Sequence, residues 1–289
     1  MVTMVSRHAD LIGVAMPSAG RVVCALGFDV TRATELLLQI AVADPGADWF
    51  EATAAGRPVP AEEIRDAWGN RLHLLRPWPG RLTIRYEAMS AEPVRDSRPV
   101  EAAHVPLDER IVALRPSRYC PSDRLFGYAS GRYGHLPAPL DRVRAICDDV
   151  FERMTYTAQS SGPQTDAVDT LLSGRGVCRD YAHLVAALCR AVDVPARFVS
   201  VYAPGLSPMD FHAVVETALD GRWQAWDATR LAPRAALVRI AHGRDAADTA
   251  FATVLSGAAQ LVELDVSAVA PGNLPIDDHD GPATLGSVG

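Results

Sequence analysis

Residues 174–191 read GRGVCRDYAHLVAALCRA, a glycine-bracketed turn that leads into an apolar helical repeat. Gly174 and Gly176 permit a tight turn, and the three- and four-residue spacing of apolar residues after Cys178 predicts a helix over 178–191. The sulfur of Cys178 is therefore expected beside unpaired backbone N–H groups, at the positive end of a helix dipole. That setting favours the thiolate, which is the species that attacks a carbonyl carbon.

Two strand-like segments, residues 211–219 and 222–227, flank the Asp220-Gly221 pair. This dipeptide is typical of a two-residue type I′ turn, so it sets the register of a predicted hairpin. In that register His212 and Asp227 are diagonal neighbours on one face of the sheet, roughly 7 Å apart at the backbone. The carboxylate is then within reach of the imidazole N–H.

A helix-start cysteine, an imidazole and an orienting carboxylate fill the three roles of covalent acyl transfer. Each residue also has an ordinary interpretation, because cysteine is a common core residue and strand histidines and loop aspartates are often simply hydrogen-bonded. The predicted sharing of one sheet face favours chemistry. We therefore take Cys178, His212 and Asp227 as candidate catalytic residues.

The composition of the chain excludes several other mechanisms and partners. All 28 basic residues among the 289 are arginine, which excludes a Schiff-base lysine and a phosphate-loop lysine. The formal net charge of −7 argues against nucleic acid or an anionic membrane as a partner. Five cysteines without a Cys-x-x-Cys pair predict neither a disulfide framework nor a zinc ribbon.

A reducing, cytoplasmic location is expected from this cysteine usage. The apolar stretch at residues 11–16 is too short for the core of a signal peptide or for a membrane span. No cofactor and no metal site is expected. His183 follows Cys178 by about 500° of helix rotation, which takes it off the cysteine's face, so it is predicted to be a core histidine.

The length of the chain is enough for about two domains. Short apolar or alternating runs at 36–42, 72–75 and 82–86 predict an antiparallel β-sandwich-like domain over residues 1–115. An α+β core is predicted over 116–270. Its elements are a helix with an apolar stripe from Leu140 to Met154 that includes Phe151, helices at 164–173 and 178–191, and strands over 197–227. Residues 271–289, rich in Gly, Pro and Asp, are expected to form a flexible tail.

Four segments together resemble the core of bacterial transglutaminase-like proteins. They are GRGVCRDYAHL at 174–184, PARFVS at 195–200, FHA at 211–213 and WQAWDAT at 223–229. The resemblance covers roughly Tyr156 to Arg234, and the β-rich first half is similar to the region that often precedes this core. It implies a papain-like fold of helices packed on an antiparallel sheet. In that fold Cys178 is the nucleophile, His212 the general base and then acid, and Asp227 the group that orients the histidine.

The chain departs from the family pattern at two places. Family members often have His-Ala-Trp and Asp-Pro-Thr, where this chain has His212-Ala213-Val214 and Asp227-Ala228-Thr229. The pocket wall therefore differs. The family itself spans amine-accepting transferases, peptidases and amidases, so the resemblance does not define the substrate.

Three further residues are candidates for substrate binding. Trp223 is predicted on the sheet face of His212, and Arg118 and Tyr119 lie in a loop that two prolines restrain just before the catalytic-type core. The alternative is that these residues pack the structure together. Cys120, in the same loop, is the second-choice thiol.

The leading hypothesis is cysteine-dependent acyl transfer on a peptide or amide substrate through a thioester, with water or an amine as acceptor. The Cys178 backbone N–H is the one oxyanion donor that the sequence nominates. A catalytically inactive peptide- or partner-binding module is the first alternative. A biosynthetic condensation enzyme with a carrier-bound acyl donor is the second. The oligomeric state stays open.

Overall fold

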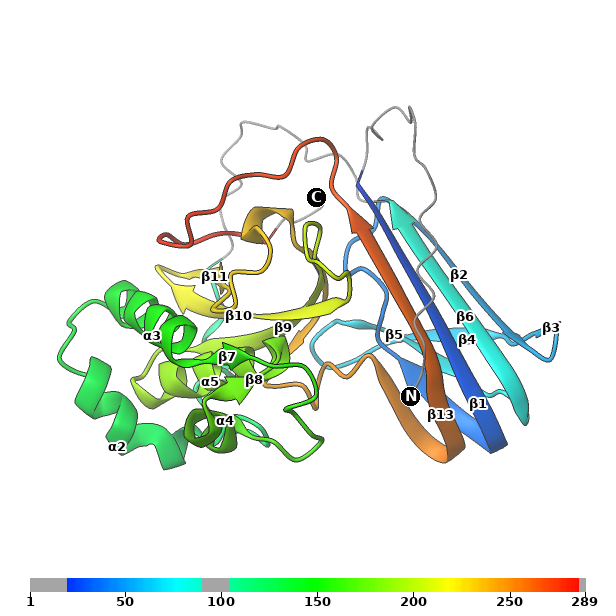
Figure 1. Cartoon of the computed structure of the whole chain (residues 1–289), viewed down its shortest axis with the longest axis horizontal. Helices are drawn as coiled ribbons and strands as arrows, with labels where there is room; N and C mark the ends of the chain where they lie inside the picture. The colour runs from blue at the N-terminus through cyan, green and yellow to red at the C-terminus, as the bar shows by residue number, and fades with distance from the viewer. Residues whose placement is uncertain (1–19, 90–103, 286–289) are drawn as a thin grey trace.

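The computed structural model describes residues 20–89 and 104–285 of the chain. These residues form a large antiparallel sheet and, beside it, a layer of helices packed on a second sheet (Figure 1). The expected class, α+β with a β-rich first half, is confirmed. The apolar stretch at 11–16, which is predicted to be too short for a signal-peptide core or a membrane span, lies outside the described residues.

The large sheet has seven strands and is antiparallel. Residues alternate along its strands between the core and the solvent: in β6, Leu82, Ile84 and Tyr86 are buried while their neighbours are exposed or half-buried. The strands are β1 (Arg21–Leu38), β2 (Ala47–Ala54), β3 (Arg57–Pro58), β4 (Ala61–Arg65), β5 (Arg71–Leu75), β6 (Gly80–Met89) and β13 (Ala252–Val269).

The long strand β1 makes this sheet continuous. Its first half pairs with β6 and its end pairs with β5, and its pairing with β13 has register shifts after Gly27, Val30, Arg32 and Glu35. Such bulges bend a strand and increase its twist. The expected sandwich-like domain therefore takes the form of one curled sheet.

The second layer contains the helices and a four-stranded antiparallel sheet of order β11-β10-β9-β12. Helix α5 packs against β9 and β10, and α2, α3 and α4 surround it (Figure 1). The elements are α1 (Leu107–Val112), α2 (Ser122–Tyr133), α3 (Pro139–Arg153), β7 (Thr155–Tyr156), α4 (Ala167–Ser173), β8 (Arg175–Gly176), α5 (Cys178–Ala191), β9 (Ala196–Tyr202), β10 (Phe211–Leu219), β11 (Arg222–Trp226), the 3-10 turn η1 (Arg234–Ala236) and β12 (Val238–Gly243).

Helix α5 begins and ends at the predicted residues. Its start is stabilised by Asp180, whose carboxylate accepts a hydrogen bond of 2.9 Å from the backbone N–H of Val177. This satisfies an otherwise unpaired donor and places negative charge at the positive end of the helix. The apolar stripe of α5, with Leu184 and Leu188, is buried in the core.

The hairpin of β10 and β11 has the predicted register. Leu219 pairs with Arg222, and the ladder continues to Val215 opposite Trp226. Asp220 and Gly221 have φ values of 50° and 77°. Positive values at both central positions are what a type I′ turn requires.

One residue of the predicted stripe on α3 faces the solvent. Val143, Ile146 and Val150 are buried as expected, but Phe151 is 41% exposed. The guanidinium of Arg230 lies over its ring, 4.1 Å from the centroid. A cation–π contact therefore covers this ring in place of core packing.

The assignment of residues 252–269 to the predicted catalytic core (116–270) does not agree with the pairing of β13. This strand falls within the segment assigned to the catalytic core, yet it pairs with β1 along nearly the whole of that 18-residue strand. In Figure 1 the first and last strands lie side by side. Without β13, one edge of β1 would present a long row of unpaired backbone groups, so the end of the chain returns to the first sheet.

The segment after β13 is predicted to be a flexible tail, but up to residue 285 it is held by contacts with the rest of the protein. Buried Arg234 donates to the Asp277 carboxylate at 2.7 Å and to the carbonyl of Gly281 at 2.7 Å. Leu285 is buried in a small cluster with Val214. A buried guanidinium needs such partners, and this segment supplies them.

Shared packing joins the two layers. The hydroxyl of Tyr202, on β9, donates a 2.7 Å hydrogen bond to the carbonyl of Ile40, just after β1. Tyr202, Ile240 and Ala241 belong to the core of the large sheet. Residues of both layers can therefore line one cavity. Among the described helices, none has both the length and the apolar character needed to cross a membrane.

Candidate active site

Cys178 is the first residue of α5, directly after the short strand β8. Strand β8 pairs with β7, and this pairing places Tyr156 beside Gly176. Of the five cysteines, all of which the structure describes, only Cys178 is partly exposed. It therefore combines a helix start with access from outside.

His212 and Asp227 are joined by a short contact. Nε2 of His212, on β10, lies 2.9 Å from Oδ2 of Asp227, the residue that follows β11. The other carboxylate oxygen accepts hydrogen bonds from the Thr229 backbone N–H at 2.9 Å and from its hydroxyl at 2.7 Å. Both side chains are buried. The imidazole is thus held by a carboxylate that is itself fixed.

The charges of this pair stabilise one another. Burial acts to lower the pKa of His212, but the Asp227 charge and hydrogen bond, together with Cys178, raise the pKa of His212 to about 10. Burial acts to raise the pKa of Asp227, yet the imidazole and Thr229 hold that pKa below its ordinary value. At neutral pH the pair is an imidazolium and a carboxylate.

The second nitrogen of His212 is left open by the Asp227 contact. An ionised carboxylate only accepts hydrogen bonds, so Nε2 carries a proton toward Asp227. Nδ1 is buried and has no oxygen or nitrogen partner among the described residues. His212 and Cys178 line the same cavity, and the sulfur contributes to the raised pKa of the ring. An imidazolium is the neighbour that stabilises a thiolate.

The cavity at this pair has a volume of about 310 Å³. Its walls come from both layers of the fold, because residues just after β1 and just before β13 meet residues of β9 and β10 there. Most of the lining is aromatic or aliphatic. The apolar wall includes Phe198, Phe211, Ile240 and Phe251, and the polar groups include Gln39, Tyr119, Arg179 and Ser200.

Of the three predicted substrate-binding residues, the structure brings only Tyr119 to this cavity. Its hydroxyl donates to the carbonyl of Pro163 at 2.8 Å, and its ring stacks on His183 with centroids 5.0 Å apart. Arg118 is exposed, and its guanidinium lies over the Tyr119 ring, 5.0 Å from the centroid. Arg118 supports the wall from outside and does not line the cavity.

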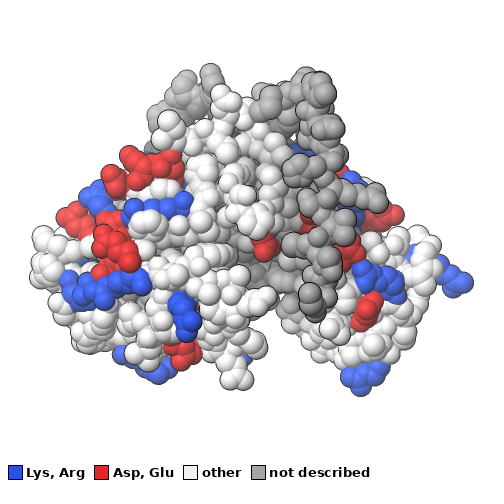
Figure 2. Space-filling view, in the orientation of Figure 1, with Lys and Arg blue, Asp and Glu red and all other residues white. Residues whose placement is uncertain are grey.

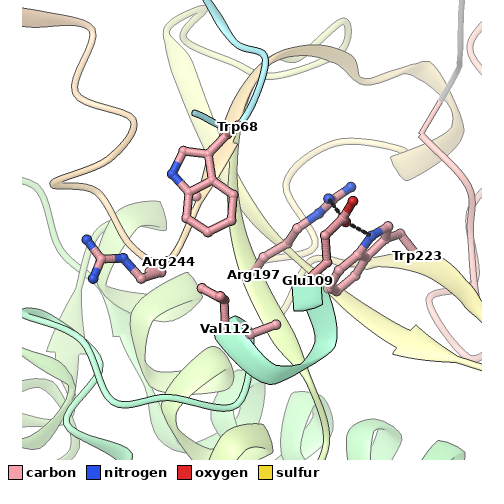
Figure 3. Close-up of a pocket in the computed structure, with 8 residues that line it drawn as sticks. Trp68, Glu109, Val112, Arg197, Trp223 and Arg244 are labelled. Carbon is pink, nitrogen blue, oxygen red and sulfur yellow. Dashed lines mark hydrogen bonds and ion pairs between the residues drawn. The ribbon is translucent and has the colours of Figure 1, made fainter. Parts of the chain in front are cut away.

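Trp223 lies at a different place, which corrects the prediction. Its indole N–H donates to Glu109 at 3.2 Å, and Arg197 lies over its ring at 4.0 Å. Figure 3 shows these three side chains around a small pocket that Trp68 also lines. Trp223 does share the strand face of His212, but it lies at the turn end of the hairpin, away from the cavity end.

The other thiols and His183 are core residues. Burial raises the pKa of Cys24, Cys120 and Cys189 to about 12 each. Cys120, the second-choice thiol, is fully buried and its sulfur contacts the carbonyl of His183. His183 is fully buried as predicted, and its Nε2 accepts from the Ala246 backbone N–H at 3.1 Å.

Three residues at the site were not predicted as site residues. Tyr156 lies beside Cys178, and burial together with this neighbour raises the pKa of Tyr156 to about 12, so the phenol stays protonated. Arg179 follows the cysteine and binds Ser161 and the Gly162 carbonyl. Gln39 comes from the first sheet. Tyr156 marks the start of the resembling segment, but no local pattern points to Gln39.

Charged side chains are scattered over the face of the molecule that Figure 2 shows, with arginines and carboxylates interspersed. Several arginines of the described residues are paired with carboxylates, as in the contacts of Arg153 with Asp149 and of Arg144 with Asp141. Over the described part of this face, no continuous basic surface forms.

The comparisons with known proteins agree with this geometry. The transglutaminase-like superfamily matches residues 128–228. The crystal structure of a candidate cysteine protease from Cytophaga hutchinsonii is 30% identical, covers 92% of this chain and 94% of that one, and has a TM-score of 0.77. The periplasmic domain of TgpA from Pseudomonas aeruginosa is 21% identical over 74% of this chain and 88% of that one, with a TM-score of 0.38.

A shorter match is found with an uncharacterized protein of Mycobacterium leprae, which is 31% identical over 113 residues. The match covers 39% of each chain, so this chain spans well under half the length of that relative.

Fold and site together define a papain-like protein of the cysteine-enzyme class, with a cysteine at a helix start and a histidine–carboxylate pair on the adjoining antiparallel strands. The nearly full-length similarity to the Cytophaga hutchinsonii structure and the family match make the assignment specific. The chain belongs to the transglutaminase-like superfamily.

Proposed function

We propose that the protein catalyses acyl transfer from a peptide or amide substrate through a thioester on Cys178. One observation carries this proposal. Asp227 holds Nε2 of His212 at 2.9 Å, and among the described residues Nδ1 has no oxygen or nitrogen partner at the cavity that Cys178 lines. A proton carrier and a nucleophile then share one access route to a substrate.

In the first half-reaction the Cys178 thiolate attacks the carbonyl carbon of the substrate, and a C–S bond forms. The C–N bond breaks, and the imidazolium of His212 gives its Nδ1 proton to the departing amine. The products are a thioester and a free amine. The raised pKa of His212 keeps the required proton on the ring at neutral pH.

In the second half-reaction water or an amine attacks the thioester carbon. Neutral His212 takes a proton from the attacking group, the C–S bond breaks, and a carboxylic acid or a new amide leaves. The thiolate–imidazolium pair is restored. Asp227 positions the ring and stabilises its positive charge in both steps.

The oxyanion of each tetrahedral intermediate needs a hydrogen-bond donor. The backbone N–H of Cys178 lies at the start of a helix, where no intrahelical partner exists for it. The Tyr156 phenol, protonated beside that residue, is the neighbouring side-chain donor.

The test is intact-mass analysis of the full chain after incubation with peptide p-nitroanilides, and with glutamine-containing peptides plus an amine. We expect an acyl adduct on the wild-type protein, and loss of adduct and turnover in Cys178→Ala with little change in the thermal transition. Cys120→Ala is the matched control and should still form the adduct. Turnover in Cys178→Ala within a few fold of wild type would remove the proposal.

We also infer a reducing, cytoplasmic location from five cysteines that are all unpaired. Cell fractionation with the tagged full-length protein tests this, and recovery outside the cytoplasmic fraction would contradict it.

A further inference from the structure

Gln39 reaches the catalytic cavity from the opposite layer of the fold. It directly follows β1, and its backbone N–H donates a 2.9 Å hydrogen bond to the carbonyl of Phe251, which directly precedes β13. Gln39 and Phe251 both line the cavity that contains Cys178 and His212. The first sheet therefore contributes two adjacent wall residues to a site whose candidate catalytic groups come from the second layer.

The side-chain amide of Gln39 is buried with an unpaired donor. It is 3% exposed, and its Nε2 has no hydrogen-bond partner among the described residues. A buried amide donor left unsatisfied costs about 1–3 kcal/mol. Such a cost is removed where a bound molecule, either a ligand or an ordered water, satisfies the group. Since the amide belongs to the cavity wall, that molecule is one that occupies the cavity.

The surroundings of Gln39 define the rest of the ligand. Phe211 and Phe251 stack with their centroids 5.3 Å apart, and Phe198 and Ile240 complete an apolar wall. A volume of about 310 Å³ is at the low end for ligand sites. It suits one bulky apolar side chain and its adjoining amide, and it is too small for an extended peptide.

We propose that this cavity binds the acyl part of the substrate, as an aromatic or branched apolar side chain, and that a neighbouring backbone carbonyl oxygen of the substrate, not that of the reacting amide, accepts a hydrogen bond from Gln39 Nε2. Gln39 is thus a specificity-determining residue contributed by the first sheet. The inference rests on the proposed function in that the ligand is taken to be an acyl donor. Binding of the ligand can still be measured without any reaction at Cys178.

The experiment measures binding to the full-length Cys178→Ala variant, so it is independent of turnover. The probes are N-acetyl-L-phenylalaninamide and N-acetyl-L-alaninamide, and the readout is Kd by calorimetry or by NMR titration. The phenylalanine probe is expected to bind at least about 10-fold more tightly than the alanine probe, because its ring buries apolar surface.

A second substitution isolates the hydrogen bond. In the Cys178→Ala background, Gln39→Met keeps the length of the side chain and removes its hydrogen-bond donor. It should raise the Kd of the phenylalanine probe by about 3- to 10-fold. Gln260→Met, at an exposed position on β13, is the matched control and should leave Kd unchanged. Gln39→Leu is a second variant in case Gln39→Met fails to fold.

The proposal is overturned if the phenylalanine probe does not bind, if both probes bind equally, or if the Gln39 variants keep the parent Kd. Failure of the proposed function has a different signature. In that case the phenylalanine probe binds with the expected dependence on Gln39, while the wild-type protein forms no acyl adduct on Cys178.

Discussion

Asp227 divides its two carboxylate oxygens between His212 and Thr229, so that Oδ2 lies 2.9 Å from the imidazole Nε2 while Oδ1 is held by Thr229. A carboxylate with both oxygens occupied cannot rotate away from the ring. The imidazole is therefore fixed in orientation, its other nitrogen has no hydrogen-bond partner among the described residues, and His212 lines the same cavity as Cys178. The properties of His212 should depend on Asp227 more than on any other residue.

The substitution Asp227→Asn should lower kcat/KM by about 10²- to 10⁴-fold, the range of a general acid–base contribution. It should also move the alkaline limb of the pH profile. In the wild type the imidazolium persists to a pKa of about 10, and without the carboxylate burial alone lowers that pKa. The measurement is kcat/KM against pH for both proteins. An alkaline limb at the same pH in both would contradict this account.

The same pair should make stability depend on pH. The pKa of His212 is raised from its ordinary 6.5 to about 10, so its contribution is fully present below pH 6.5 and is lost as the pH rises toward 10. Urea unfolding of the wild type and of Asp227→Asn across this window should show the difference in unfolding free energy shrinking with pH. A constant difference would show that the imidazolium is not linked to folding.

Iodoacetamide should label Cys178 first among the five thiols at neutral pH. It is partly exposed and lies beside an imidazolium, whereas the other four are buried and burial raises their pKa values. Peptide mapping after short labelling measures the order. Five uniformly slow thiols would instead support the catalytically inactive partner-binding module.

Gly176, two residues before Cys178, should not tolerate a side chain. A Cβ at Gly176 would lie 2.7 Å from the Cβ of Asp180, so Gly176→Ala should destabilise the protein by about 1–3 kcal/mol. Gly127, at an exposed position within α2, has open space where a Cβ would lie. The control Gly127→Ala should stabilise by about 0.5–1 kcal/mol. Equal effects in urea unfolding would refute the steric argument.

The segment after β13 should depend on one ion pair. Asp277→Ala leaves the guanidinium of Arg234 buried without its carboxylate and should cost about 3–5 kcal/mol, with faster proteolysis within residues 271–285. Asp278→Ala, at an exposed neighbouring position, is the control and should behave like the wild type. Unchanged proteolysis of Asp277→Ala would mean that other contacts hold the segment.

Local patterns in the chain were enough to predict the elements that hold the candidate triad. The period of apolar residues defined α5 to the residue, and Asp220-Gly221 defined the register of the hairpin. These succeed because helix periodicity and a two-residue turn are encoded by neighbours in sequence. Trp223 shows the limit of such reasoning, since sharing a strand face does not say how far along the strand the cavity lies.

Tertiary structure alone decided three features of the protein. They are the pairing of β13 with β1, the contacts that hold residues 271–285, and the position of Gln39 in the cavity wall. Each feature joins residues that are far apart in the chain. Local propensity does not predict which distant strand a segment will pair with, or which buried charge it will bind. What the chain determined by itself was the helix that begins with Cys178 and the hairpin that brings His212 to Asp227. The apolar wall and the unsatisfied amide that line the same cavity depend on the tertiary structure. They reach the cavity because β1 pairs with β13 and the two layers pack together there.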